Sequence, residues 1–132
     1  MTSSPAPTPS AGSLHDRPTA AELVQAVREY LEQDVMPGTE GRLSFHARVA
    51  ANALAMVERE LTDGAALDAA EHDRLVRFLG HDGTIADLTT ELARGIRAGD
   101  FDARRAELVE LLRATTLAKL AVANPTYAES RP

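Results

Sequence analysis

The apolar residues of this chain recur at steps of three and four residues, and no segment alternates with a period of two. Steps of three and four place side chains on one face of a helix, whereas alternation places them on one face of a strand. The clearest run consists of Ile85, Leu88, Leu92 and Ile96. The sequence therefore predicts an all-α fold.

Capping and breaking residues mark where the helices begin and end. Thr19 and Glu22 form a capping box, whose side chains satisfy amides at a helix start, and Gly80 supplies a left-handed residue at a helix end. These signals predict five helices, over residues 19–35, 42–61, 65–79, 85 to about 99, and 102–123. Short connections favour an antiparallel bundle. The last helix is apolar over more than half of its circumference and is predicted to be central.

The first 18 residues differ in composition from the rest of the chain. They contain four of the seven prolines, together with Ser, Thr, Ala and Gly. Such a segment buries too little apolar surface to offset the entropy of ordering it. We therefore expect a disordered tail over residues 1–18 and one helical bundle domain over residues 19–132.

Charge and composition argue against several classes of function. The net charge of −6 and the absence of Trp disfavour binding to nucleic acid, because a phosphate backbone attracts basic surfaces and single strands stack on aromatic rings. The absence of cysteine excludes disulfides, iron–sulfur clusters and thiol catalysis. No apolar run is long enough to span a membrane, and the N-terminus lacks the pattern of a signal peptide. We expect a cytoplasmic protein.

His46 lies near the middle of the apolar arc of the second predicted helix. It is interpreted either as a neutral core histidine or as a proton carrier or ligand contact, because imidazole titrates near neutral pH. Arg48 and Asn52 are one turn apart at the edge of the same arc. They are candidates to bond to one another or to an anion, unless Arg48 merely buries its aliphatic stem at the boundary.

Lys119 lies among apolar residues of the last predicted helix. Its ammonium either reaches solvent near the helix end or forms a buried ion pair, for which Asp34 and Glu60 are the candidate partners. An anionic substrate group is a further possibility, with Thr115 and Thr116 as hydroxyl donors. His46, Arg48, Asn52, Thr115 and Lys119 are therefore the candidate binding residues, and none is assigned a catalytic role.

Neither a metal nor a cofactor is expected. His72 and the dipeptide His81-Asp82 have ligand chemistry, but the chain lacks a His-Glu-x-x-His motif and a Glu-x-x-His pair on two helices. Gly80 and Gly83 are not followed by the Lys and Ser or Thr of a phosphate-binding loop.

Three segments resemble an uncharacterised bacterial family of small helical domains. They are residues 16–23, 41–54 and 113–120, the last followed by Asn124-Pro125. Members of that family are encoded beside aminoglycoside-phosphotransferase-like kinases and acyl-CoA dehydrogenases. The resemblance covers the chain after the tail and implies a context, hydroxyacyl or related acyl-CoA catabolism, but it brings no activity and no catalytic residue.

Three functions follow as hypotheses. The first is an accessory or interaction module that binds a kinase-like enzyme, its acyl substrate or an acyl-CoA dehydrogenase; it predicts an exposed apolar patch, covered in isolation by a homodimer. Alanines 47, 50, 51 and 55 would allow another helix to approach closely there. The second is a small enzyme or ligand-binding protein with a polar pocket around His46 and Lys119. The third is a structural stabiliser without a ligand.

Overall fold

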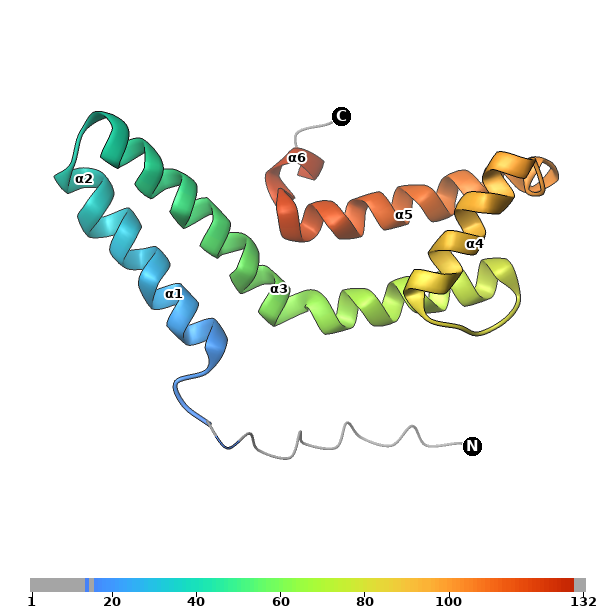
Figure 1. Cartoon of the computed structure of the whole chain (residues 1–132), viewed down its shortest axis with the longest axis horizontal. Coiled ribbons are helices and arrows are strands. Elements are labelled where there is room, and N and C mark those ends of the chain that lie inside the picture. Colours follow the sequence, from blue (N-terminus) through green and yellow to red (C-terminus); the bar gives the residue numbers. More distant parts are fainter. Residues whose placement is uncertain (1–13, 15, 130–132) are drawn as a thin grey trace. The chain divides into compact units, whose positions relative to one another are not determined.

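The computed structural model describes residue 14 and residues 16–129, and every regular element in these residues is helical (Figure 1). In chain order the elements are α1 (Ala20–Tyr30), the π-helical turn η1 (Leu31–Val35), α2 (Met36–Gly38), α3 (Gly41–Leu79), α4 (Ile85–Ala98), the 3₁₀ turn η2 (Asp102–Arg104), α5 (Arg105–Ala123) and α6 (Pro125–Glu129). The predicted all-α fold is confirmed. The predicted tail over residues 1–18 lies mostly outside the described residues, and the domain bounds stay a prediction.

The chain divides within α3 into two compact units, the first ending at Ala55 and the second beginning at Met56. In the first unit the chain reverses after α2, so that α1 and the first part of α3 run in opposite directions (Figure 1). Ser44 Oγ donates a hydrogen bond of 3.1 Å to the carbonyl oxygen of Met36 and closes this reversal. We call this unit the α1–α3 hairpin.

The first helical run is longer than the sequence predicted and extends to Gly38 instead of ending at Val35. Thr19 caps its start as expected, accepting a hydrogen bond of 3.1 Å from the amide of Glu22. Proline usually breaks a helix because its ring clashes with the carbonyl four residues earlier. Here the amide of Met36 bonds to Leu31, five residues earlier, and such a wider π-turn accommodates Pro37 without ending the helix.

The second and third predicted helices are one continuous helix, α3, so the predicted break at residues 62–64 is wrong. A glycine inside a helix costs about 1 kcal/mol relative to alanine, which good helix formers on both sides offset. Gly64 is buried, and the side chain of Glu60 lies over it; a Cβ on Gly64 would meet Glu60 Oε1 at 3.0 Å. Gly64 therefore provides room for a side chain and does not end the helix.

The second unit contains the remainder of α3, then α4 and α5, and its helix ends follow the sequence signals. Thr84 caps α4 by accepting a hydrogen bond of 3.1 Å from the amide of Asp87. Gly80 and Gly99 follow α3 and α4 with φ of 83° and 79°, the left-handed region that glycine adopts without strain. Local chemistry thus determines where these helices stop.

The core of the second unit is small and comes mainly from α3 and α4. Its buried members are Leu75, Phe78, Leu88, Leu92 and Leu111. Phe101 packs edge-on against Phe78, with ring centroids 5.0 Å apart, and also covers Gly95, where a Cβ would overlap the ring. In α5 only Leu111 is buried, so the prediction that this helix is central is wrong. Three main helices leave much of the apolar circumference of α5 uncovered.

Candidate functional site

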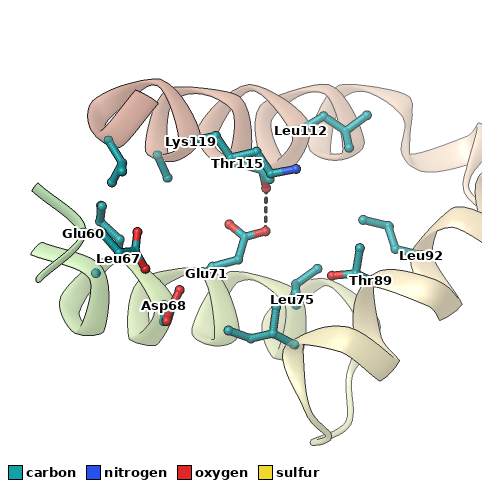
Figure 2. A pocket seen from close by; sticks show the side chains of 14 residues that line it. Glu60, Leu67, Asp68, Glu71, Leu75, Thr89, Leu92, Leu112, Thr115 and Lys119 are labelled. Atoms are coloured by element: carbon teal, nitrogen blue, oxygen red, sulfur yellow. Dashed lines mark hydrogen bonds between the residues drawn. The ribbon is translucent and has the colours of Figure 1, made fainter. Parts of the chain in front are cut away.

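A concave surface of about 560 Å³ lies in the second unit, between α3 and α5 with α4 at one end (Figure 2). Its walls are mainly apolar; they include Leu67, Leu75, Ile85, Leu92, Leu112 and Val122. Its polar members are Glu60, Asp68, Glu71, Thr89, Thr115 and Lys119. A mainly apolar cavity of this size with a few polar groups has the character of a small-molecule site. We call it the α3–α5 groove.

One hydrogen bond crosses the middle of the α3–α5 groove. Thr115 Oγ1 donates to Glu71 Oε1 at 2.7 Å (Figure 2). The other carboxylate oxygen of Glu71 accepts a hydrogen bond of 2.7 Å from Arg74, and the side chain of Glu71 is only 15% exposed. The charge of Glu71 is therefore balanced by Arg74, and the middle of the groove presents little unmet polarity.

The two ends of the α3–α5 groove differ in polarity. Leu75 and Leu92 are buried at one end, with exposures of 1% and 6%. Glu60 and Asp68 are exposed near the other end, and Lys119 is exposed on α5. The α3 residues that line the groove run from Glu60 to Leu75, which is roughly 22 Å at the rise of an α-helix. It is thus an elongated, amphipathic surface.

Lys119 is exposed, and so the sequence-based alternative of a buried ion pair is wrong. Glu60, one of its two predicted partners, lines the same groove. Within the described part of the chain, however, no ion pair or hydrogen bond joins these two side chains. The long aliphatic stem of Lys119 lets its ammonium reach water, which is the other alternative that the sequence predicts.

The sequence pointed to Thr115, to Lys119 and, as a partner for Lys119, to Glu60, but not to Asp68 and Glu71, the other two α3 carboxylates that line the groove. Glu60, Asp68 and Glu71 lie at steps of eight and three residues, which bring them to one helix face. This periodicity is a signal in the sequence. The predicted break at residues 62–64 separates Glu60 from the other two carboxylates and hides this signal.

The other three predicted site residues lie on the part of α3 that belongs to the α1–α3 hairpin. His46, Arg48 and Asn52 are all exposed, so placing His46 in the core was wrong. Arg42 Nε donates a hydrogen bond of 3.4 Å to His46 Nε2. The buried face of this helical segment passes instead through Ala47 and Ala51, at 6% and 2% exposure. Convergence of the five predicted residues on one ligand stays a prediction.

The α1–α3 hairpin leaves most of its large apolar side chains in solvent. In the described part of this unit, only Ala47 and Ala51 are buried. Half or more of the residue surface is exposed at Leu23, Val27, Tyr30, Leu43, Phe45 and Val49. Helical geometry puts Phe45 and Val49 on the face of α3 opposite to Ala47 and Ala51. Two of the four alanines predicted to allow close helix approach, Ala47 and Ala51, are therefore buried within the hairpin itself. The large apolar side chains of the hairpin remain exposed to solvent.

Two histidines of the second unit pair with carboxylates and hold the loop between α3 and α4. His72 Nε2 lies 2.8 Å from Asp82 Oδ1, and His81 Nε2 lies 2.7 Å from Glu91 Oε2. The hydrogen bond to Asp82 raises the pKa of His72, and that to Glu91 raises the pKa of His81. Among the described residues, no three His, Cys, Asp or Glu side chains gather as metal ligands would.

The fold and the α3–α5 groove define an all-α protein with an elongated, mainly apolar concave surface. The chain belongs to the family described as a domain of unknown function (DUF6285), whose model matches residues 37–127. Comparisons with curated proteins and with solved structures find no match. The resemblance noted in the sequence to an uncharacterised domain family is thereby confirmed.

In the described part of the chain, no helix combines the length and the apolar character that crossing a membrane requires.

Proposed function

We propose that this protein is an accessory or interaction module and that the α1–α3 hairpin is its binding surface. One observation carries the proposal: the hairpin buries two alanines among its described residues while Leu23, Val27 and Phe45 are 54%, 51% and 61% exposed. Exposed apolar side chains of this kind favour an interaction site, because their burial against a partner removes them from water.

The partner that the sequence resemblance suggests is an aminoglycoside-phosphotransferase-like kinase or an acyl-CoA dehydrogenase. A second copy of the chain would cover the same surface when that enzyme is absent. The test is co-expression with a kinase of this class from the same genome, followed by size-exclusion chromatography of the tagged complex. Stoichiometric co-elution is the expected result.

A matched pair of α1 variants makes the test specific to the surface. Leu23→Lys places a charge on the exposed apolar face, whereas Gln25→Lys places the same charge on the opposite face of the helix. We expect the first variant to abolish co-elution and the second to retain it. A wild-type chain that remains monomeric and binds no such enzyme would refute the proposal.

The second candidate function is that of a small-molecule-binding protein, and the α3–α5 groove supports it. Thr115 and Lys119 line this groove together with buried leucines. Methyl-detected NMR titration with amphipathic compounds tests this candidate, and saturable shifts confined to Leu75 and Leu92 are the expected result.

A further inference from the structure

The charged groups near one end of the α3–α5 groove are mainly carboxylates. Glu60 and Asp68 are both exposed, and neither forms a hydrogen bond or ion pair within the described part of the chain. Lys119 supplies the single positive charge of the lining, and Glu71 is already paired with Arg74. The unbalanced charge at this end is therefore negative.

The backbone of α3 leaves room for the Glu60 carboxylate in the groove. Gly64 lies one turn after Glu60 and is buried, and a Cβ there would come within 3.0 Å of Glu60 Oε1. The absence of this Cβ lets the Glu60 side chain fold along the helix. The backbone at Gly64 thus allows the Glu60 carboxylate to lie at this end of the groove.

The opposite end of the groove offers mainly apolar contacts, and Thr89 is the polar residue of its lining there (Figure 2). Leu75 and Leu92 form its buried surface, and Ile85 and Leu112 extend it. An apolar chain placed there loses contact with water, which is favourable in proportion to the area buried. The groove therefore matches a molecule that is apolar at one end and positively charged at the other.

We propose that the α3–α5 groove binds a small amphipathic amine, with the apolar chain against Leu75 and Leu92 and the protonated amino group beside Glu60 and Asp68. The inference rests on the second candidate function and adds the chemical class of the ligand. An alkyl ammonium is charged at neutral pH, as the side chain of lysine is. The negative group of an anionic ligand, such as an acyl carboxylate, would meet two unpaired carboxylates at the same place.

The test compares three probes that share one chain and differ in charge: n-octylamine, 1-octanol and octanoate. Binding is followed by NMR of leucine methyl groups at pH 7 and low salt. We expect the amine to bind most tightly and octanoate most weakly, with saturable shifts at Leu75 and Leu92. Added salt should weaken binding of the amine more than that of octanol, because it screens charge.

Variants on α3 assign the charge to particular residues. Asp68→Asn and Glu60→Gln should each weaken binding of the amine about fivefold, as expected for the loss of one nearby charge in water, and leave octanol unchanged. Asp63→Asn is the matched control, because Asp63 is an exposed carboxylate on the same helix outside the groove lining.

The results distinguish binding in the groove from a preference for a cationic ligand. If octanol or octanoate binds as tightly as the amine, or if Asp63→Asn weakens the amine as much as Asp68→Asn does, the assignment of a cationic ligand is overturned while the groove remains a binding site. If none of the three probes gives saturable shifts, both the ligand class and the second candidate function are refuted.

Discussion

Thr115 on α5 donates a hydrogen bond of 2.7 Å to Glu71 on α3, across 44 positions of sequence (Figure 2). Two further bonds join α3 to this part of the chain within the second unit, one through the turn η2 that precedes α5 and one through the end of α5. Arg104 Nη1 donates to the carbonyl oxygen of Phe78 at 2.9 Å, and Arg59 Nε donates to that of Val122 at 2.7 Å. Along α3 the order of the three contacts is opposite to their order along η2 and α5, as expected for antiparallel neighbours.

Removal of the Thr115 hydroxyl should destabilise the second unit. Thr115→Val retains the shape of the side chain and leaves Glu71 without one of its two partners, at a cost of about 1 kcal/mol. Thr116→Val is the control, because Thr116 is exposed and its hydroxyl bonds only to Leu112 of its own helix, at 2.8 Å. Urea unfolding followed by circular dichroism measures both. Equal losses for the two variants would show that the bond between the helices contributes nothing.

Arg104 should contribute more to stability than its neighbour Arg105. Besides its bond to Phe78, its guanidinium carbon lies 4.1 Å from the centroid of the Phe78 ring. A hydrogen bond and a cation–π contact together predict a loss of about 1–2 kcal/mol for Arg104→Ala. Arg105 is exposed and forms no such contact in the described residues, so Arg105→Ala should change the free energy of unfolding by less than about 0.5 kcal/mol. A similar effect of both substitutions would contradict this account.

The loop between α3 and α4 should be more stable at mildly acidic pH. The raised pKa values of His72 and His81 mean that their stabilising contribution is complete below the ordinary value of 6.5 and disappears as the pH rises through the folded values. Asp82 acts in the opposite direction. The hydrogen bond from the Gly83 amide and then the one from His72 lower the pKa of Asp82. Its stabilising contribution is therefore complete above the ordinary value of 3.8 and is lost as the pH falls through the lowered pKa of the folded state.

NMR titration of the histidine rings checks these directions. Asp82→Asn should return the pKa of His72 toward its ordinary value. Glu91→Gln should do so for His81 and leave His72 unchanged, because Glu91 contacts only His81 of the two. Ordinary pKa values for both rings in the wild type would mean that these ion pairs do not form in solution.

Alanine should have opposite effects at two buried glycines. At Gly95 a Cβ overlaps the Phe101 ring, and overpacking of this kind costs about 1–3 kcal/mol. At Gly64 the neighbour is the mobile end of Glu60, so Gly64→Ala should gain up to about 1 kcal/mol from helix propensity while it displaces that carboxylate. Thermal unfolding of the two variants measures the difference. A loss of stability at both positions would show that Glu60 is held firmly.

Helix ends could be predicted because the signals for them are local. Thr19, Thr84, Gly80 and Gly99 act through the backbone within one turn, and each is found where its chemistry requires. Gly64 could not be interpreted in the same way. A glycine inside a helix and one after a helix look alike in sequence, and only the buried position under Glu60 distinguishes them.

The candidate site was only partly accessible from the sequence. Thr115 and Lys119 attracted attention because they are polar among apolar residues, and both line the groove. Their counterparts Glu71 and Asp68 look like ordinary charges of a solvated helix face. His46 illustrates the opposite error, because an apolar arc indicates which side chains share a face but not whether a neighbouring helix covers that face.

The sequence by itself determined that this chain is helical, where most of its helices begin and end, and that it carries no spanning helix in its described part. These properties depend on contacts within one or two turns. The tertiary structure decided which apolar faces are buried, that α3 is continuous, and that Glu71 meets Thr115. Such properties depend on pairings between helices that are distant in sequence, and amphipathic periodicity alone does not specify them.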